Sequence, residues 1–259
     1  LYTALFSSCV YEDYGKCSRM FMLQPRYLLH TGEGDRFGEA VHHIDVYAFD
    51  SLGIYRKMFR DKGAHLKNGY RMPIDLPEGK WTFLCLGGKV GDYEIGIFKT
   101  GIPQQFSPAV SPGITTLSDF RVKAYFEQKE NLEYSFGELF FGRLDSVEIT
   151  ADNGGTGVVD LMKNTNKIEV RVKGIADGSS ARITSDNGRF NSENVTPADA
   201  GTIIYVPYYS ASQADDTRVF QFDVLRLYTD GHLFLKLLNP DGTDVIPGFT
   251  KDLINAIMS

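Results

Sequence analysis

The stretch that decides the fold is IEVRVK at residues 168–173, in which apolar and charged side chains alternate strictly. This period of two is typical of a β-strand in a sheet that has one face in solvent. A second alternating stretch, IDVYAF at residues 44–49, precedes the turn residues DSLG at 50–53 and the apolar pair Ile54-Tyr55. That order predicts a β-hairpin. Both halves of the chain are therefore expected to consist of β-strands.

The same pattern of short apolar stretches and turn residues extends along the chain. Further strands are expected at residues 20–29, 70–76, 81–86, 120–125, 134–141, 181–184, 202–209, 219–228 and 233–238. Many short strands at this spacing, with little helix, are typical of β-sandwiches. The Gly-rich stretch DNGGTG at 152–157 lies near a change in composition, so we predict one sandwich at 18–145 and a second at 146–259. Residues 249–258 fit a short helix or a strand.

Composition limits the function classes. The 259 residues are 42% hydrophobic and 23% charged, which argues against a disordered chain. The net charge of −6 argues against a nucleic-acid-binding protein, which needs a basic face. No apolar run reaches the roughly 18–20 residues that cross a bilayer.

The amino-terminal stretch predicts a lipoprotein. Residues 1–17 are interpreted as the remnant of a secretory signal followed by a tether. Phe6, Ser7 and Ser8 form a lipobox before Cys9, because signal cleavage needs small side chains and only a thiol carries thioether-linked diacylglycerol. Each buried acyl CH₂ group contributes about 0.8 kcal/mol, so a multiply acylated Cys9 anchors firmly. The alternative is a core or disulfide cysteine in a fragment.

Two cysteines remain. In an oxidising compartment Cys17 and Cys85 form an even pair, which makes a disulfide between them possible. A free, buried Cys85 is the alternative, because it lies in the apolar stretch WTFLCL at 81–86. Trp81, in the same stretch, is expected to pack inside rather than form a platform for a sugar.

No metal site is predicted. His42 and His43 precede Asp45, but neighbouring strand residues point to opposite faces and no third ligand follows at a useful spacing. The Asp-rich stretches 152–154 and 239–244 lack the full ligand set of a calcium loop and are interpreted as turns.

No catalytic residue, cofactor or small-molecule substrate is predicted either. The sequence contains no Gly-x-Ser-x-Gly, phosphate-loop or His-Glu-x-x-His motif, so an enzyme is not expected. Carboxylate pairs such as Asp215-Asp216 leave a sandwich glycosidase as an alternative.

Several stretches, in the right order along the chain, resemble the FimB/Mfa-type fimbrial anchor subunits of Bacteroidales. They are CVYEDY at 9–14, IDVYAFD at 44–50, YRM at 70–72, DLPEGKWTF at 75–83 with GG at 87–88, ELFFG at 138–142 and DLMKNTNKI at 160–168. The resemblance implies an all-β fold of two tandem transthyretin-like Greek-key β-sandwich domains. It also implies a surface-exposed lipoprotein in the cell outer membrane, held through the Cys9 lipid, whose partner is a fimbrial shaft subunit. The chain departs from the family at Cys85, and the family's carboxyl end is expected to be longer.

The resemblance suggests how such a subunit works. A sandwich that lacks a strand accepts one from a neighbouring subunit by strand addition. A chain that keeps Met20–Leu29 as its first strand fills its own groove and terminates assembly, and Val245–Met258 is the expected donor. The alternatives are a glycan-binding surface lipoprotein of a nutrient-uptake system, and a tip or accessory adhesin cleaved after Arg19 or Arg26.

Overall fold

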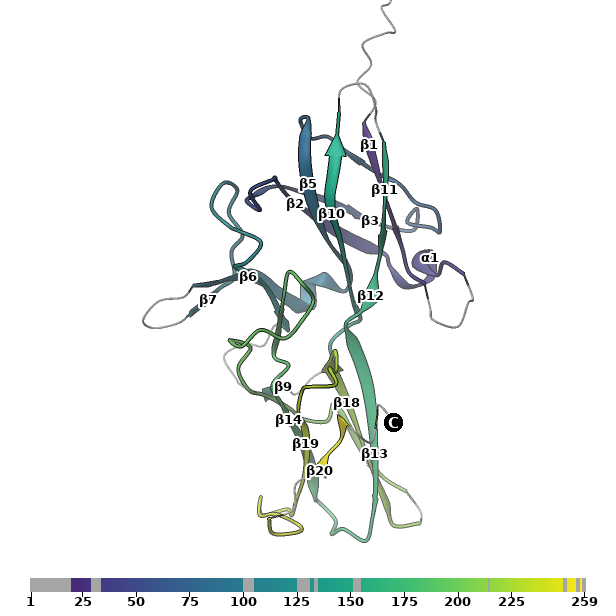
Figure 1. Ribbon diagram of the computed structural model, residues 1–259. Helices are drawn as coiled ribbons and strands as arrows, with labels where there is room; N and C mark the ends of the chain where they lie inside the picture. Colours follow the sequence, from purple (N-terminus) through teal and green to yellow (C-terminus); the bar gives the residue numbers. More distant parts are fainter. Residues whose placement is uncertain are drawn as a thin grey trace, which may run out of the picture.

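The computed structural model describes residues 20–28, 34–99, 105–124, 131–132, 135–150, 155–213, 215–248, 251–254 and 257. They form an elongated molecule whose regular elements are almost all strands (Figure 1). Of the described residues, 55% lie in strands and 4% in helices. The helical elements α1 (Phe37–Ala40) and η2 (Val90–Asp92) are single turns. The prediction of an all-β chain with two tandem sandwiches is confirmed.

A five-stranded sheet lies at the centre of the first sandwich. Its strands are, in spatial order, β12 (Met162–Lys163), β10 (Leu139–Ile149), β5 (Gly79–Gly88), β2 (His43–Phe49) and β3 (Tyr55–Lys62). The side chains of β2 are buried from Ile44 to Phe49. Ile44 and Val46 face one apolar cluster, while Tyr47 and Phe49 face another. Both faces of this sheet therefore need a covering layer.

The predicted hairpin at 44–55 is confirmed. β2 pairs antiparallel with β3, and the turn between them is closed by the Asp50 carboxylate. Its Oδ1 accepts hydrogen bonds from the backbone N–H groups of Leu52 and Ile54, at 2.9 and 3.0 Å. Gly53 adopts φ +71°, a left-handed conformation that glycine adopts without a steric penalty.

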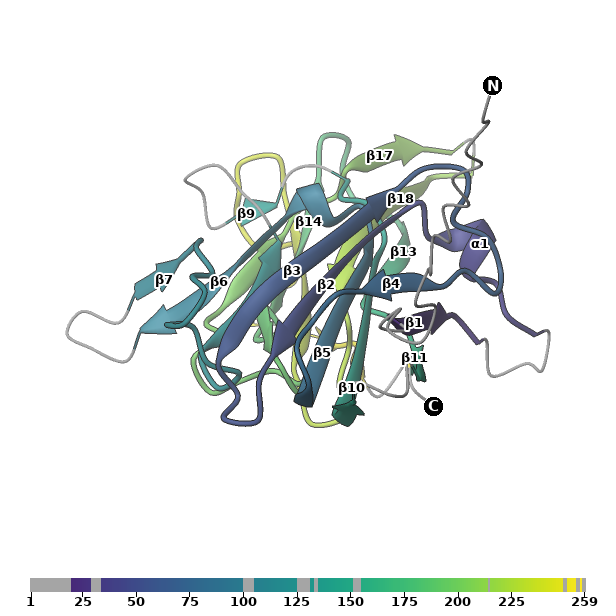
Figure 2. The same ribbon diagram turned by 90° about the horizontal axis from the view of Figure 1, so that it is seen from above.

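The first covering layer has three strands. They are β11 (Thr156–Asp160), β1 (Phe21–Arg26) and β4 (Met72–Ile74), and Figure 2 shows them beside the central sheet. Phe21 of β1 stacks on Phe83 of the central sheet with ring centroids 5.9 Å apart. Trp81 is buried, as predicted, in the same apolar cluster as Phe21 and Phe83. Its Nε1 donates a hydrogen bond to the Pro77 carbonyl at 3.0 Å.

The second covering layer combines segments that are far apart in the chain. Its strands are β6 (Tyr93–Lys99), β7 (Gln105–Ser107), β8 (Phe120–Ala124) and β15 (Arg189–Asn191), in the order β15-β8-β6-β7. Phe120 of β8 meets Tyr47 of the central sheet edge to face at 5.3 Å. β15 follows the first sandwich in sequence by many residues, so the chain returns to complete this layer.

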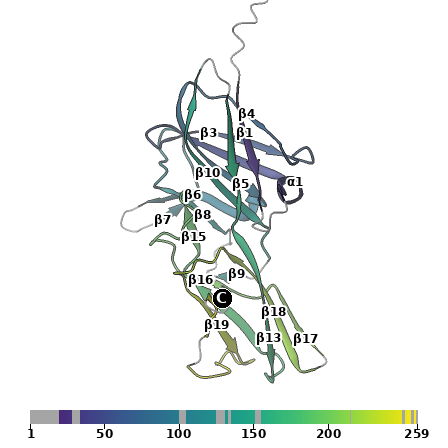
Figure 3. The same ribbon diagram turned by 45° about the vertical axis from the view of Figure 1, so that its right-hand side comes forward.

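The second sandwich packs two further sheets face to face (Figure 3). One sheet contains β13 (Thr165–Lys173), β18 (Thr217–Leu225) and β17 (Tyr209–Ser212). The other contains β20 (Lys251–Asp252), β19 (Leu233–Leu238), β14 (Ser180–Ser185), β16 (Ile203–Tyr205) and β9 (Asn131–Leu132). Phe220 and Phe222 of β18 and Ile183 of β14 are fully buried between them. The alternating stretch 168–173 lies in β13, with Ile168, Val170 and Val172 partly buried against the core.

The sheets of the first sandwich extend beyond the expected boundary between residues 145 and 146. That boundary falls inside β10, where only a register irregularity between Leu144 and Val147 interrupts the pairing with β5. β11 and β12 then pair with β1 and β10, so residues up to Lys163 contribute to the first sandwich. Figure 1 shows β11, β12 and β13 following one another along one side of the molecule.

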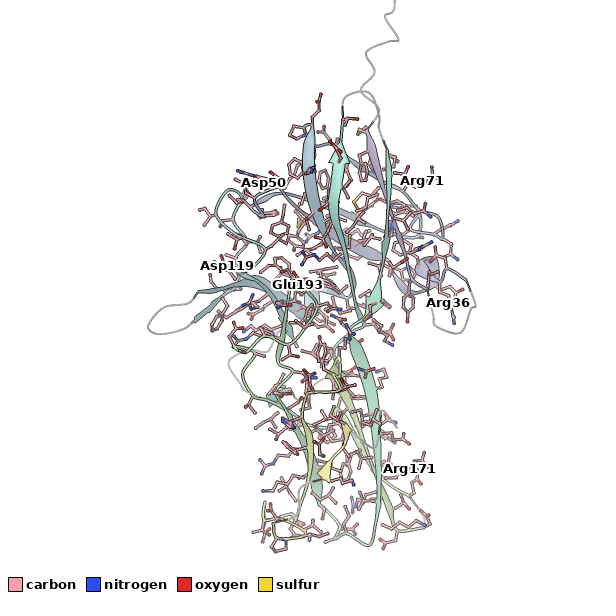
Figure 4. The ribbon with its side chains drawn as sticks, in the orientation of Figure 1. Arg36, Asp50, Arg71, Asp119, Arg171 and Glu193 are labelled. Carbon is pink, nitrogen blue, oxygen red and sulfur yellow. The ribbon has the colours of Figure 1, made fainter. Side chains whose placement is uncertain are left out.

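Residues 189–199, which we call the clasp, connect the two sandwiches. Phe190 meets Phe141 of the central sheet edge to face at 5.7 Å, and Arg189 lies over the Phe98 ring at 5.1 Å. Asn194 and Asn164 exchange hydrogen bonds between their buried amide side chains. Glu193, labelled in Figure 4, lies at the same junction. The clasp therefore joins the sandwiches through apolar, amide and backbone contacts.

Candidate functional site

The strand that bears on assembly is β1, because it lies in the middle of its sheet. On one edge it pairs in parallel with β11, Met22 opposite Thr156, and on the other it pairs antiparallel with β4, Leu23 opposite Met72. Leu23 is fully buried. The predicted first strand at Met20–Leu29 is therefore present as Phe21–Arg26, with β11 beside Met22–Arg26 on one edge and β4 beside Phe21–Leu23 on the other.

The local sequence explains this strand. Burial alternates along it, with Phe21, Leu23 and Pro25 inward. At its end the Arg26 guanidinium forms a bidentate ion pair with the Asp160 carboxylate of β11, in which the Nη2–Oδ2 distance is 3.1 Å. The parallel pairing with β11 joins residues that are far apart in sequence, and no local pattern in the sequence predicted it.

The carboxyl-terminal segment, expected to act as a donor, lies on its own sandwich where the structure describes it. β20 pairs with β19, Leu235 opposite Lys251. The Val245 N–H donates to the Leu237 carbonyl at 3.0 Å, and Ile254 is buried in the core. Residues 249–250, 255–256 and 258–259 lie outside the described residues. The segment therefore occupies a sheet edge of its own chain.

Cys85 of β5 is buried, and it has no disulfide partner among the residues that the structure describes. Burial raises the pKa of its thiol well above the ordinary range. The lipobox residues Phe6, Ser7 and Ser8, the lipidation residue Cys9, and Cys17 and Arg19 lie outside the described residues. A disulfide between Cys17 and Cys85 and lipidation of Cys9 stay predictions.

The two adjacent histidines have different surroundings. His42 is exposed, whereas His43 Nε2 is hydrogen-bonded to the buried Asp45 carboxylate at 2.8 Å. No group of three or more His, Cys, Asp and Glu side chains in the described residues is placed to hold a metal ion. In the same part of the chain, no helix has the length and apolar character needed to span a membrane.

The fold places this chain among the all-β proteins built from two tandem β-sandwiches, with the first strand held in the middle of a sheet. The chain matches the family model of the fimbrillin-A associated anchor proteins Mfa1 and Mfa2 over residues 14–259, and it belongs to that family. The minor fimbrium anchoring subunit Mfa2 of Porphyromonas gingivalis is 23% identical in an alignment of 261 positions that covers 96% of this chain and 75% of that protein.

Solved structures share the fold. The fimbrial anchor protein Mfa2 of Porphyromonas gingivalis superposes with a TM-score of 0.74 and 20% identity over 93% of this chain and 84% of that one. A Bacteroides thetaiotaomicron protein described as a candidate polysaccharide-binding protein gives a TM-score of 0.76 and 22% identity over 92% and 81% of the two chains. The family relatives are fimbrial structural and anchor proteins.

Proposed function

We propose that this protein is the outer-membrane anchor and terminal subunit of a fimbrium. In this proposal a lipid on Cys9 holds the chain to the membrane, and strand addition joins it to a shaft subunit. The observation that carries the proposal is the place of β1, with a strand on both edges and Leu23 buried beneath. Because the chain fills this groove itself, a strand from another subunit has no vacant position there, and growth stops.

The membrane attachment is tested by replacing Cys9 with alanine in cells that assemble the fimbrium. We expect the Cys9→Ala protein and the attached fimbriae to appear in the culture medium, since the acyl chains provide the anchor. Cys17→Ala is the matched control and should stay in the membrane fraction. The intact mass of the mature amino terminus reports acylation directly. Retention of Cys9→Ala in the membrane fraction contradicts the proposal.

The donor segment is proposed to be Val245–Met258. Its edge position on β19 makes it the segment that leaves with the loss of few strand pairings. When this segment leaves its own sheet, Ile254 becomes exposed to solvent, at a cost of about 1.5–3 kcal/mol. Binding of the segment to the shaft subunit has to offset that cost. A chain ending at Ile246 should stay in the membrane fraction while fimbriae are released. Fimbriae that remain attached to this shortened anchor refute the donor assignment.

Two other functions are tested on the same mature protein. The similarity to a candidate polysaccharide-binding protein supports a glycan-binding surface lipoprotein, which glycan-array binding would reveal. A tip or accessory adhesin would instead be cleaved after Arg19 or Arg26. Since Arg26 ends β1, cleavage there would separate β1 from the rest of the chain. A mature terminus directly after either arginine would favour that function over the anchor.

A further inference from the structure

A cavity of about 540 Å³ lies at one end of the central sheet. It forms where β2 begins and where β3 and β5 end. His43 of β2 lies opposite Lys62 of β3 in the antiparallel register. The Lys89 N–H, just after β5, donates to the Glu138 carbonyl at 2.8 Å. Strand pairing thus places side chains from three separate segments around one opening.

Glycines shape the wall and position Lys89. A Cβ at residue 137 would lie 2.1 Å from Lys89 Cγ, so the lysine stem rests directly on the Gly137 backbone. Gly88 adopts φ +92°, and a Cβ there would lie 2.3 Å from the Glu138 carbonyl oxygen. A side chain at residue 137 would push the lysine away, and one at residue 88 would separate the two backbone segments that form this wall. The Lys89 ammonium is therefore carried on a stem whose path is fixed by close packing.

His43 is held by a buried carboxylate. Asp45, which is fully buried, binds His43 Nε2 at 2.8 Å and receives two hydrogen bonds from the Arg60 guanidinium at 2.6 Å each. A ring fixed by such a supporting shell offers a donor or acceptor in a defined position. Asp45 is thus a positioning residue for His43.

The charges around the cavity are uneven. Glu138 is neutralised by an ion pair with Lys163, and the Asp92 carboxylate accepts the Gly137 N–H at 2.7 Å. Among the described residues, neither the Lys62 nor the Lys89 ammonium forms an ion pair. The cavity therefore combines two unpaired cations with two carboxylates that already have partners and can still accept hydrogen bonds from hydroxyl groups.

We propose that this cavity binds a sugar acid, with the ligand carboxylate at Lys62 and Lys89 and ligand hydroxyls at Asp92 and Glu138. The volume falls within the range of about 300–1,000 Å³ that is typical of small-molecule sites, and it exceeds what an inorganic anion fills. Ala40 and Val90 add apolar surface for the carbon skeleton. This inference does not depend on the anchor function.

Isothermal titration with D-glucuronate tests the proposal. The comparison ligands are D-glucose, which lacks the carboxylate, and acetate, which lacks the hydroxyls. We expect glucuronate to bind with a Kd of about 1 mM or tighter, at least tenfold more strongly than either comparison ligand. Acetate binding as strongly as glucuronate overturns the role of the hydroxyls, and glucose binding as strongly overturns the role of the carboxylate. Absence of glucuronate binding at about 10 mM overturns the site.

Variants locate the binding. Lys62→Gln and Lys89→Gln should each weaken glucuronate binding by about tenfold, the equivalent of one charge-assisted contact. Lys80→Gln is the matched control, because Lys80 is exposed at the opposite end of β5. His43→Gln should also weaken binding. Undiminished affinity in the Lys62→Gln, Lys89→Gln double variant refutes the site, and the unfolding midpoint of each variant shows that the fold is intact.

Discussion

Replacing Leu23 with alanine tests whether β1 is a structural strand that fills its own groove. Leu23 is fully buried between β1's two neighbouring strands and the central sheet. Leu23→Ala removes three carbon atoms from an apolar site, worth about 2.4 kcal/mol at roughly 0.8 kcal/mol per CH₂ group. The cavity left behind raises the loss in unfolding free energy to about 3–4 kcal/mol.

Trp81 provides the assay. It is the only tryptophan in the chain and is buried in the same apolar cluster as Leu23. Urea unfolding followed by its fluorescence therefore reports on the sandwich that contains β1. Gln24→Ala is the matched control, because Gln24 is the next residue on the outward face, and its effect should stay within about 0.5 kcal/mol.

The reasoning is refuted if Leu23→Ala lowers the free energy of unfolding by less than about 1 kcal/mol, or by no more than Gln24→Ala does. It would mean that β1 is not held in the core, and the groove would then be open to a strand from another subunit. A peptide with the sequence of residues 20–28 gives a second measurement. It should bind a chain that begins after residue 28 and raise the unfolding midpoint of that chain with peptide concentration.

Three further predictions concern the clasp, a turn and the buried thiol. Phe190→Ala should cost about 3–5 kcal/mol in Trp81-monitored unfolding, since it removes a buried ring at the junction of the sandwiches. Burial opposes ionisation of Asp50, but the Ile54 N–H and the Arg56 guanidinium bind the carboxylate and lower its pKa overall. Its stabilising effect should be complete above the unfolded pKa of about 3.9 and lost as pH falls towards the folded value, so Asp50→Asn should flatten the acid side of a stability-against-pH curve. In a chain whose other two cysteines are alanine, Cys85 should react with a thiol reagent only after unfolding, as an absorbance assay would show.

Local patterns predicted the local structure well. The hairpin at 44–55 and the strand at 168–173 follow from alternation and turn residues alone, because neighbouring side chains on a strand face opposite sides. Trp81 is buried, as its place in the apolar stretch 81–86 predicts. These elements depend on a few consecutive residues, and the sequence contains that information directly.

Pairings between distant segments were not predictable in this way. β11 joins β1, and β15 joins β8, through registers set by packing between residues more than 60 positions apart. The expected boundary after residue 145 reflected composition, whereas β12 returns to the central sheet through its pairing with β10. The cavity was not predicted because it needs the ends of several strands together, and no local pattern in the sequence shows that those ends meet.

The return of β15 to the first sandwich has a consequence for the order in which the chain matures. A chain that is synthesised amino end first exposes the open edge of β8 until residues 189–191 have followed. β1 likewise waits for residues 156–160 before both of its edges are paired. Such long-range closure makes folding slow and leaves apolar surface uncovered in the meantime. Partly completed chains are thus the stage at which a chaperone has most to protect.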